Sequence, residues 1–278
     1  MIIIFSDLDG TLLDAESYSY EPAREALKEI STLQIPLVMI SSKTKKEIES
    51  VRRSLGNTYP FVSENGGGIF VPEGCFPFPV SYARRTGNYL VVESGIPYAR
   101  LTEFLDRIIR EDALPIRGFH SLSVESISRL TGLSIETSSM AKEREYDEPF
   151  LFDGDEAQWN RLEKLVESDG LALTRGGRFN HLSGQNDKGT AAGILIDCYR
   201  HQYPDALIVG LGDAANDLPF LRMVDYPVLI QRPDGTYEPE IDTPELHHAP
   251  HPGPAGWNSA VLELIRKDIS TSNQGLNM

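Results

Sequence analysis

The segment from Ile2 to Phe5 constrains the fold of this chain more than any other. It is a short, continuous run of β-branched and aromatic residues, which is typical of a strand buried on both faces within a parallel sheet. The sequence Asp7-Leu8-Asp9-Gly10-Thr11 follows this run directly. Open α/β sheets place their ligand crevice at the carboxyl ends of such strands, so the two carboxylates are expected to face a binding site.

Helical and buried-strand patterns alternate at both ends of the chain. Pro22 begins a segment with apolar residues at helical spacing, and residues 35–40 are predicted to form a second buried strand. Thr44 and Glu47 have the spacing of a capping box at the start of another helix. Further elements are predicted at 61–62 (strand), 187–203 (helix), 206–211 (strand) and 227–230 (strand). The alternation predicts an α/β core with a doubly wound, Rossmann-like parallel sheet, formed by residues 1–83 and 185–278.

The middle of the chain has a different pattern. Strands are predicted at 89–92, 114–116, 150–152 and 171–174, and helices at about 97–112, 134–144 and 155–168. We expect residues 84–184 to form a smaller α+β domain inserted into the core. A single continuous sheet is the alternative, and it would need more strands than open twisted sheets usually carry.

The charge and hydropathy of the chain exclude several classes of partner. Its 41 acidic and 26 basic residues give a net charge of -15, which argues against binding to nucleic acid or to an anionic membrane surface. The longest apolar runs fall far short of the ~18 residues of a membrane span, and the N-terminus lacks the basic region of a secretory signal. A cytoplasmic protein is therefore expected, and the sequence gives no indication of its oligomeric state.

The paired acids need a positive charge or a shared proton, because two carboxylates in a partly dry crevice cannot both stay ionised alone. Mg²⁺ would fit, since it prefers oxygen ligands; the alternative is that Asp9-Gly10 is only a turn. Asp213 and Asp217, four residues apart after another buried strand, would face the same sheet edge. Capping of a helix by Asp213 is an alternative there, as a solvated surface position is for Lys188.

Four segments in order resemble the motifs of the haloacid dehalogenase superfamily of phosphatases: DLDGTLLD, the strand ending at Ser41, Lys188, and GLGDAAND at 210–217. The resemblance implies that Asp7 is a nucleophile that forms an aspartyl-phosphate. It implies that Asp9 acts first as a general acid and then as a general base. Ser41 and Lys188 would hold the phosphate, and only the resemblance selects Ser41 over Ser42.

The same resemblance implies a Mg²⁺ cofactor. Asp7, Asp213 and the backbone carbonyl of Asp9 would be its ligands, with Asn216 and Asp217 in supporting roles around them.

Further segments resemble mannosyl-3-phosphoglycerate phosphatases, which produce the osmolyte mannosylglycerate: SSKT at 41–44, SENGG at 63–67, REYDEPF at 144–150, GRFNH at 177–181 and GPAGW at 253–257. The implied partner is a small phosphorylated sugar-glycerate. Arg, Lys or His would bind its anions and Asp, Glu or Asn its hydroxyls. The candidates are Lys43, Arg144, Arg178 and His181 for the anions, and Glu64, Asn65, Asp147 and Glu148 for the hydroxyls. Turns at 147–149 and 176–177 are the alternative interpretation of two of these segments.

Other functions stay open at this stage. A related phosphatase could act on a glucosyl-3-phosphoglycerate or another sugar phosphate with the same chemistry. A phospho-acceptor switch also combines acids, a hydroxyl and a lysine, although Asp9 and the length of the chain argue against it. A non-catalytic, acidic metal-binding protein is a further alternative. The histidines 247, 248 and 251 are not expected to bind a metal, because Pro250 prevents a helical pair.

Overall fold

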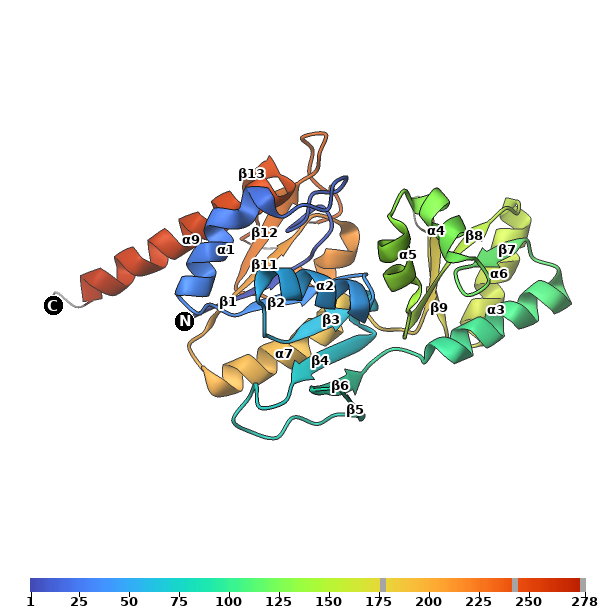
Figure 1. The fold of residues 1–278 in the computed structure, drawn as a ribbon, viewed down its shortest axis with the longest axis horizontal. Coiled ribbons are helices and arrows are strands. Elements are labelled where there is room, and N and C mark those ends of the chain that lie inside the picture. The colour runs from blue at the N-terminus through green and yellow to red at the C-terminus, as the bar shows by residue number, and fades with distance from the viewer. Residues whose placement is uncertain (176–178, 242–244, 276–278) are drawn as a thin grey trace.

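The computed structural model describes residues 1–175, 179–241 and 245–275, with side chains described up to residue 267. Within these residues two sheets form two bodies that lie side by side (Figure 1). The strands of the larger body are β1 (Ile2–Ser6), β2 (Leu37–Ile40), β3 (Phe61–Ser63), β4 (Gly68–Pro72), β5 (Arg84–Thr86), β6 (Tyr89–Glu93), β11 (Leu207–Gly212), β12 (Tyr226–Gln231) and β13 (His247–Pro252). Its helices are α1 (Arg24–Thr32), α2 (Lys45–Leu55), α7 (Lys188–Gln202), α8 (Leu218–Leu221) and α9 (Gly253–Gly275).

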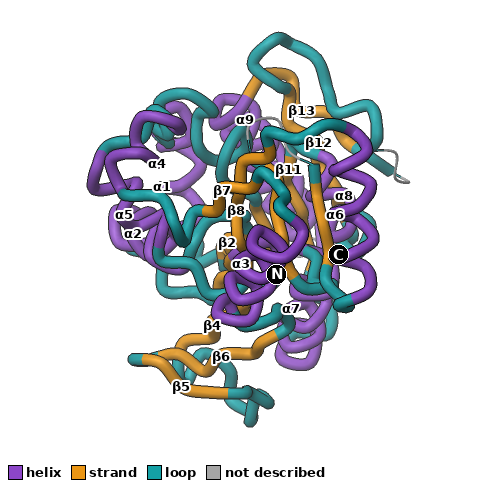
Figure 2. The backbone as a smooth tube through the Cα atoms, turned by 90° about the vertical axis from the view of Figure 1, so that its right-hand side faces the viewer, coloured by secondary structure: helices purple, strands orange, loops and turns teal. Residues whose placement is uncertain are grey.

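The large sheet has the order β13-β12-β11-β1-β2-β3-β4-β6-β5. The strands from β13 to β3 are parallel, whereas β4, β6 and β5 continue the sheet in antiparallel pairs. Figure 2 shows these last three strands in the lower part of the view. The predicted fold class, a mainly parallel α/β sheet with helices, is therefore confirmed.

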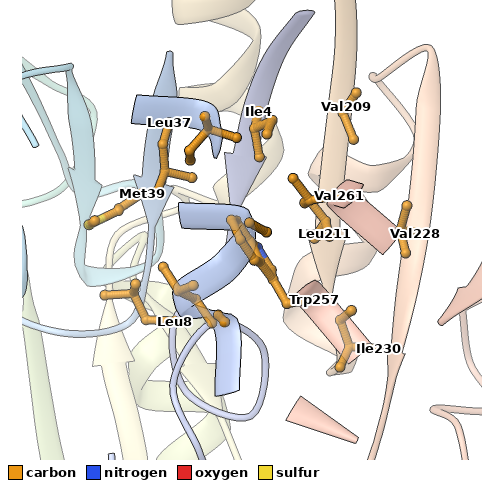
Figure 3. Close-up of a cluster of buried hydrophobic side chains, with 14 of the residues drawn as sticks. Ile4, Leu8, Leu37, Met39, Val209, Leu211, Val228, Ile230, Trp257 and Val261 are labelled. Carbon is orange, nitrogen blue, oxygen red and sulfur yellow. The ribbon is translucent and has the colours of Figure 1, made fainter. Parts of the chain in front are cut away.

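Both faces of β1 are buried, as its uninterrupted apolar sequence predicts. Ile2 and Ile4 pack in a cluster with residues of α1, α2 and α9, and Trp257 of α9 lies at its centre (Figure 3). Ile3 and Phe5 face the other way and pack against α7 and α8. Because helices cover both faces, the polar residues that end the parallel strands can be reached only at the sheet edge.

The smaller body is an antiparallel sheet with helices. Its strands β7 (Ile116–Gly118), β8 (Asp147–Phe152), β9 (Ala172–Thr174) and β10 (Asn180–Ser183) have the order β7-β8-β10-β9. Its helices are α3 (Tyr98–Asp112), α4 (Val124–Thr131), α5 (Ile135–Lys142) and α6 (Glu156–Ser168). Residues of α3 and α6 pack with the sheet in a separate apolar core. Residues 147–149 lie within β8, so the alternative of a turn there is wrong.

One strand that the sequence pattern assigned to the insert belongs to the large sheet. β6 pairs with β4 over five residue pairs, including Phe70 with Val91, because this antiparallel register buries apolar side chains of both strands. β5, which starts at the predicted boundary, pairs with β6. We therefore propose that the inserted domain spans about 94–183 rather than 84–184. Among the described helices, none is both long and apolar enough to cross a membrane.

Candidate active site at the carboxyl edge of the large sheet

Four segments bring the predicted catalytic residues to one edge of the sheet. Asp7 follows β1, Ser41 follows β2 and Asp213 follows β11. Lys188 is the first residue of α7, which is capped by Asp187, and Asp217 lies in the short turn before α8. Because the strands are parallel, their carboxyl ends meet at this edge.

Lys188 is the centre of a buried ion-pair cluster. Its Nζ donates to Oδ1 of Asp7 at 2.7 Å and to Oδ1 of Asp217 at 2.6 Å, and all three side chains are buried. Burial disfavours the charged lysine, but the two carboxylates outweigh it and raise the pKa of Lys188. The pKa of Asp7 is well above its usual value because of its own burial, which the attraction of Lys188 only partly offsets. The cation placed at the start of a helix thus has a partner that compensates for the dipole.

Asp7, Asp213 and Asp217 form an acidic cluster whose oxygens lie within 4.8 Å of one another. Burial, and then the charge of Asp217, raises the pKa of Asp213 to about 6. Thr11 Oγ1 donates to Oδ1 of Asp213 at 2.8 Å. Gly10 has a φ of 78°, and a Cβ at this position would overlap the Asp213 carboxylate. A divalent cation would relieve the repulsion of this set, and hard oxygen ligands suit Mg²⁺.

Asp217 is held by the protein on both oxygens. Its Oδ2 accepts hydrogen bonds from the backbone N–H groups of Asp213 and Ala214 at 2.9 and 3.1 Å, while Oδ1 accepts from Lys188. These contacts fit the supporting role that was predicted for Asp217. Asn216 donates instead to Oδ1 of Asn65 at 3.1 Å, across the site.

Asp9 is paired with a lysine that was predicted to bind substrate. Lys43 Nζ lies 3.0 Å from Oδ2 of Asp9 and 3.6 Å from Oε1 of Glu47. Burial raises the pKa of Asp9 although Lys43 opposes this. The other oxygen of Asp9, Oδ1, is buried and has no hydrogen-bond partner within the described part of the chain. The structure therefore places Lys43 beside the predicted acid and base.

The turn that follows β3 connects the site to the inserted domain. Glu64 and Asn65 both have positive φ, 49° and 53°, an uncommon conformation for residues other than glycine. The Asn65 N–H donates to the Ser41 carbonyl at 3.0 Å. The Glu64 carboxylate accepts from the backbone N–H groups of residues 145, 146 and 147. Burial raises the pKa of Glu64 to about 7 against the opposing effect of Arg144.

Tyr146 is a docking residue that the sequence analysis missed. It is 1% exposed, and its ring lies against Gly67, Gly68 and Gly95, where any side chain would overlap it. Its hydroxyl donates to Oε1 of Glu93 at 2.7 Å. A glycine-rich turn opposite an aromatic residue is a signal only once the two segments are known to meet.

A cavity of about 330 Å³ joins the catalytic edge to the inserted domain. It is lined by Ser42, Glu64, Asn65, Asp147, Thr174, His181, Ser183, Asn186, Asp187, Lys188, Asn216 and Pro219. Four predicted substrate-binding residues are in this wall, whereas Lys43, Arg144 and Glu148 are not, and Arg178 lies outside the described residues. A larger cavity of about 510 Å³, beside Arg52 and Tyr89, contains none of the predicted catalytic residues.

Arg144, Asp147 and His181 form a connected chain next to this cavity. Arg144 Nη1 donates to Oδ2 of Asp147 at 2.8 Å, and the same oxygen lies 3.0 Å from Nδ1 of His181. Burial opposes ionisation of Asp147, but His181 and Arg144 outweigh it and lower its pKa. Asp147 is therefore an ionised acceptor between two donors.

Comparisons with known proteins show the family of this chain. The family model of haloacid dehalogenase-like hydrolases matches residues 4–75. A protein from Methanococcoides burtonii is 44% identical over 96% of this chain and 98% of its own length. The chain therefore belongs to the haloacid dehalogenase-like hydrolases, and it is a phosphatase.

The named relatives define a narrower group. The Methanococcoides burtonii relative is a glucosyl-3-phosphoglycerate/mannosyl-3-phosphoglycerate phosphatase. A relative from Pyrococcus horikoshii, 36% identical over 80% of this chain and 88% of its own, is a mannosyl-3-phosphoglycerate phosphatase. Among solved structures, a Thermoplasma acidophilum protein superposes with a TM-score of 0.64 at 17% identity, over 95% of this chain and 98% of its own. That likeness shows the shared fold.

Proposed function

We propose that this phosphatase removes the phosphate from mannosyl-3-phosphoglycerate and glucosyl-3-phosphoglycerate in a Mg²⁺-dependent reaction. The observation that carries the proposal is the cavity between Lys188 and His181, which gives one ligand access to both the catalytic edge and the inserted domain. The names of relatives that are 36–44% identical support this substrate class. The alternatives of a phospho-acceptor switch and of a non-catalytic binding protein do not hold for a phosphatase of this hydrolase family.

In the proposed first step, Asp7 attacks the phosphorus atom. Lys188 holds Oδ1 of Asp7 and fixes the carboxylate, and Oδ2 accepts no hydrogen bond from the described residues. Attack by Oδ2 forms the aspartyl-phosphate while the bond from phosphorus to the ester oxygen breaks. Asp9 donates a proton to that leaving oxygen. Lys188 and the Ser41 hydroxyl stabilise the charge on the phosphoryl oxygens.

In the proposed second step, Asp9 accepts a proton from a water molecule that attacks the same phosphorus atom. The bond from phosphorus to the Asp7 oxygen breaks, which releases inorganic phosphate and regenerates the carboxylate. One group can serve both steps because it loses its proton in the first and regains one in the second. The pairing with Lys43 holds Asp9 in place between the two steps.

Mg²⁺ would be held by Asp7, Asp213 and the backbone carbonyl of Asp9. When bound, it would supply positive charge to the phosphoryl oxygens. Asp217 already accepts hydrogen bonds on both oxygens, so its role is to position Lys188 and the backbone at Asp213. The substrate is a small, water-soluble anion, and we propose that the protein acts on it in the cytoplasm.

Phosphate release from a panel of esters tests the proposed substrate class. The panel contains the mannosyl and glucosyl phosphoglycerates, mannose 6-phosphate and glucose 6-phosphate, each with Mg²⁺ or with EDTA. We expect kcat/KM to be highest for the two phosphoglycerates and activity to be lost in EDTA. A preference for the hexose phosphates would disprove the substrate assignment and leave the chemistry intact.

A further inference from the structure

Two histidines of the inserted domain are held by consecutive carboxylates of β8, and they differ in one respect. His120 has partners on both ring nitrogens: Nδ1 lies 2.6 Å from Oε1 of Glu148, and Nε2 lies 3.1 Å from Oδ1 of Asp106. His181 has Nδ1 3.0 Å from Oδ2 of Asp147, and its Nε2 has no hydrogen-bond partner in the described part of the chain. Consecutive strand residues point to opposite faces, and of these two pairs only Asp147 and His181 line the cavity, whereas Glu148 and His120 do not.

The contact with Asp147 fixes the orientation of the His181 ring and the nitrogen that carries a hydrogen. Asp147 is 2% exposed and is compensated by Arg144 at 2.8 Å. An ionised carboxylate only accepts hydrogen bonds, so Nδ1 of His181 carries the hydrogen. This leaves Nε2, on the opposite side of the ring, for a ligand. The His181 side chain is 30% exposed, so a ligand can reach it.

The charged groups around the cavity are paired within the protein, except that Nε2 of His181 has no partner among the described residues. Among its described lining residues, the basic ones are Lys188 and His181. Lys188 is occupied by Asp7 and Asp217. The acidic lining residues are also satisfied within the protein, because Asp147 is paired with Arg144 and His181, Glu64 accepts three backbone N–H groups, and Asp187 caps α7.

A ligand with two anionic ends therefore meets Lys188 at one end and His181 at the other. We infer that His181, as an imidazolium with a hydrogen on both ring nitrogens, donates from Nε2 to the carboxylate of the substrate's glycerate moiety. Asp147 and Arg144 are positioning residues that orient His181 and do not touch the ligand. The identity of the carboxylate rests on the proposed function.

Inhibition by two small anions isolates the contribution of the carboxylate to binding. D-3-Phosphoglycerate and sn-glycerol 1-phosphate have the same configuration at C2 and differ only in that a carboxylate replaces a hydroxymethyl group. Both are tested as competitive inhibitors of para-nitrophenyl phosphate hydrolysis by the full chain with Mg²⁺. We expect the wild type to bind 3-phosphoglycerate about 10-fold more tightly or better, the range of a hydrogen bond to a charged group.

The His181→Gln variant should lose this preference, so that the two inhibition constants become nearly equal. The matched control His120→Gln should keep it, because His120 is held in the same way but does not line the cavity. An unchanged preference in His181→Gln, or equal weakening of both inhibitors, would overturn the inference.

Asp147→Asn tests the positioning role. It should weaken binding of 3-phosphoglycerate alone, because an asparagine keeps an acceptor but loses the charge that orients His181. The Michaelis constant for para-nitrophenyl phosphate should stay unchanged. A purely structural role would shift both inhibition constants and this Michaelis constant together, and that result would refute the positioning role.

The inhibition test and the substrate panel can fail separately. If the wild type releases no phosphate from either glycosyl-phosphoglycerate but prefers 3-phosphoglycerate through His181, the proposed function fails and the carboxylate site stands. If it releases phosphate from both while His181→Gln keeps the preference, the carboxylate site fails and the proposed function stands.

Discussion

Replacement of Tyr146 by alanine should weaken the contact between the inserted domain and the core and so lower the free energy of unfolding. The tyrosine ring is buried against the backbone of Gly67, Gly68 and Gly95. Its hydroxyl donates to Glu93 and accepts from Arg84 Nη2 at 2.9 Å. These contacts come from the turn before β4, from β4, β5 and β6, and from the segment that follows β6. The substitution therefore removes one contact shared by segments that are distant in sequence.

The size of the effect follows from the burial. Truncation of a fully buried aromatic side chain to alanine costs about 3–5 kcal/mol, because the transfer of the ring from water is lost and a cavity remains. The glycines have no side chains that could fill the space, so a value within that range is expected. Tyr146→Phe keeps the ring and removes two hydrogen bonds, each of which contributes about 1 kcal/mol.

Urea unfolding followed by circular dichroism measures these differences. Tyr82, which is 42% exposed, provides the control, since Tyr82→Ala should change the free energy of unfolding by less than about 0.5 kcal/mol. The order of destabilisation should be Tyr146→Ala, then Tyr146→Phe, then Tyr82→Ala. A loss below about 1 kcal/mol for Tyr146→Ala would refute the anchoring role.

Three further perturbations test the catalytic edge. Lys188→Met leaves its two carboxylate partners buried without a cation, so it should abolish phosphate release and reduce the free energy of unfolding by about 3–5 kcal/mol; unchanged turnover would contradict its role. Gly10→Ala should weaken activation by Mg²⁺, because its Cβ would overlap the Asp213 carboxylate, whereas Gly56→Ala has open space and should not; equal Mg²⁺ titrations would count against the metal site. The third perturbation, Asp213→Asn, removes the charge of Asp213. In EDTA, the Tm of the wild type should fall relative to the Tm of Asp213→Asn as pH rises through about 6. The raised pKa of Asp213 means that the folded state binds its proton more tightly than the unfolded chain does; a difference in Tm that is independent of pH would disagree.

Much of the core was predictable because local patterns and tertiary packing agree there. The apolar run before Asp7 could be satisfied only by a strand covered on both faces, and Thr44 with Glu47 forms the expected capping box. The insert was less predictable. β5 and β6 were assigned to the insert because sequence order does not indicate antiparallel pairing with β4. Pairing with β4 makes β6, and β5 with it, part of the large sheet.

The candidate site was also predictable only in part. Asp7 and Asp217 could be placed at one edge because they follow buried strands, whereas Lys188 was assigned to the site by the family resemblance. The structure brings the three residues into contact. The engagement of Glu64 with backbone N–H groups, and of Lys43 with Asp9, depends on segments far apart in the chain. Residue type alone could not show that these charges are already paired.

We propose that Asp7 carries the phosphoryl group during turnover. Acid quenching of the protein during steady-state hydrolysis, followed by mass spectrometry of its peptides, tests this directly. We expect a phosphoryl group on the peptide that contains Asp7. A folded Asp7→Asn variant should show neither this adduct nor multiple turnover. Turnover by Asp7→Asn, or a phosphoryl group on a peptide without Asp7, would contradict the account.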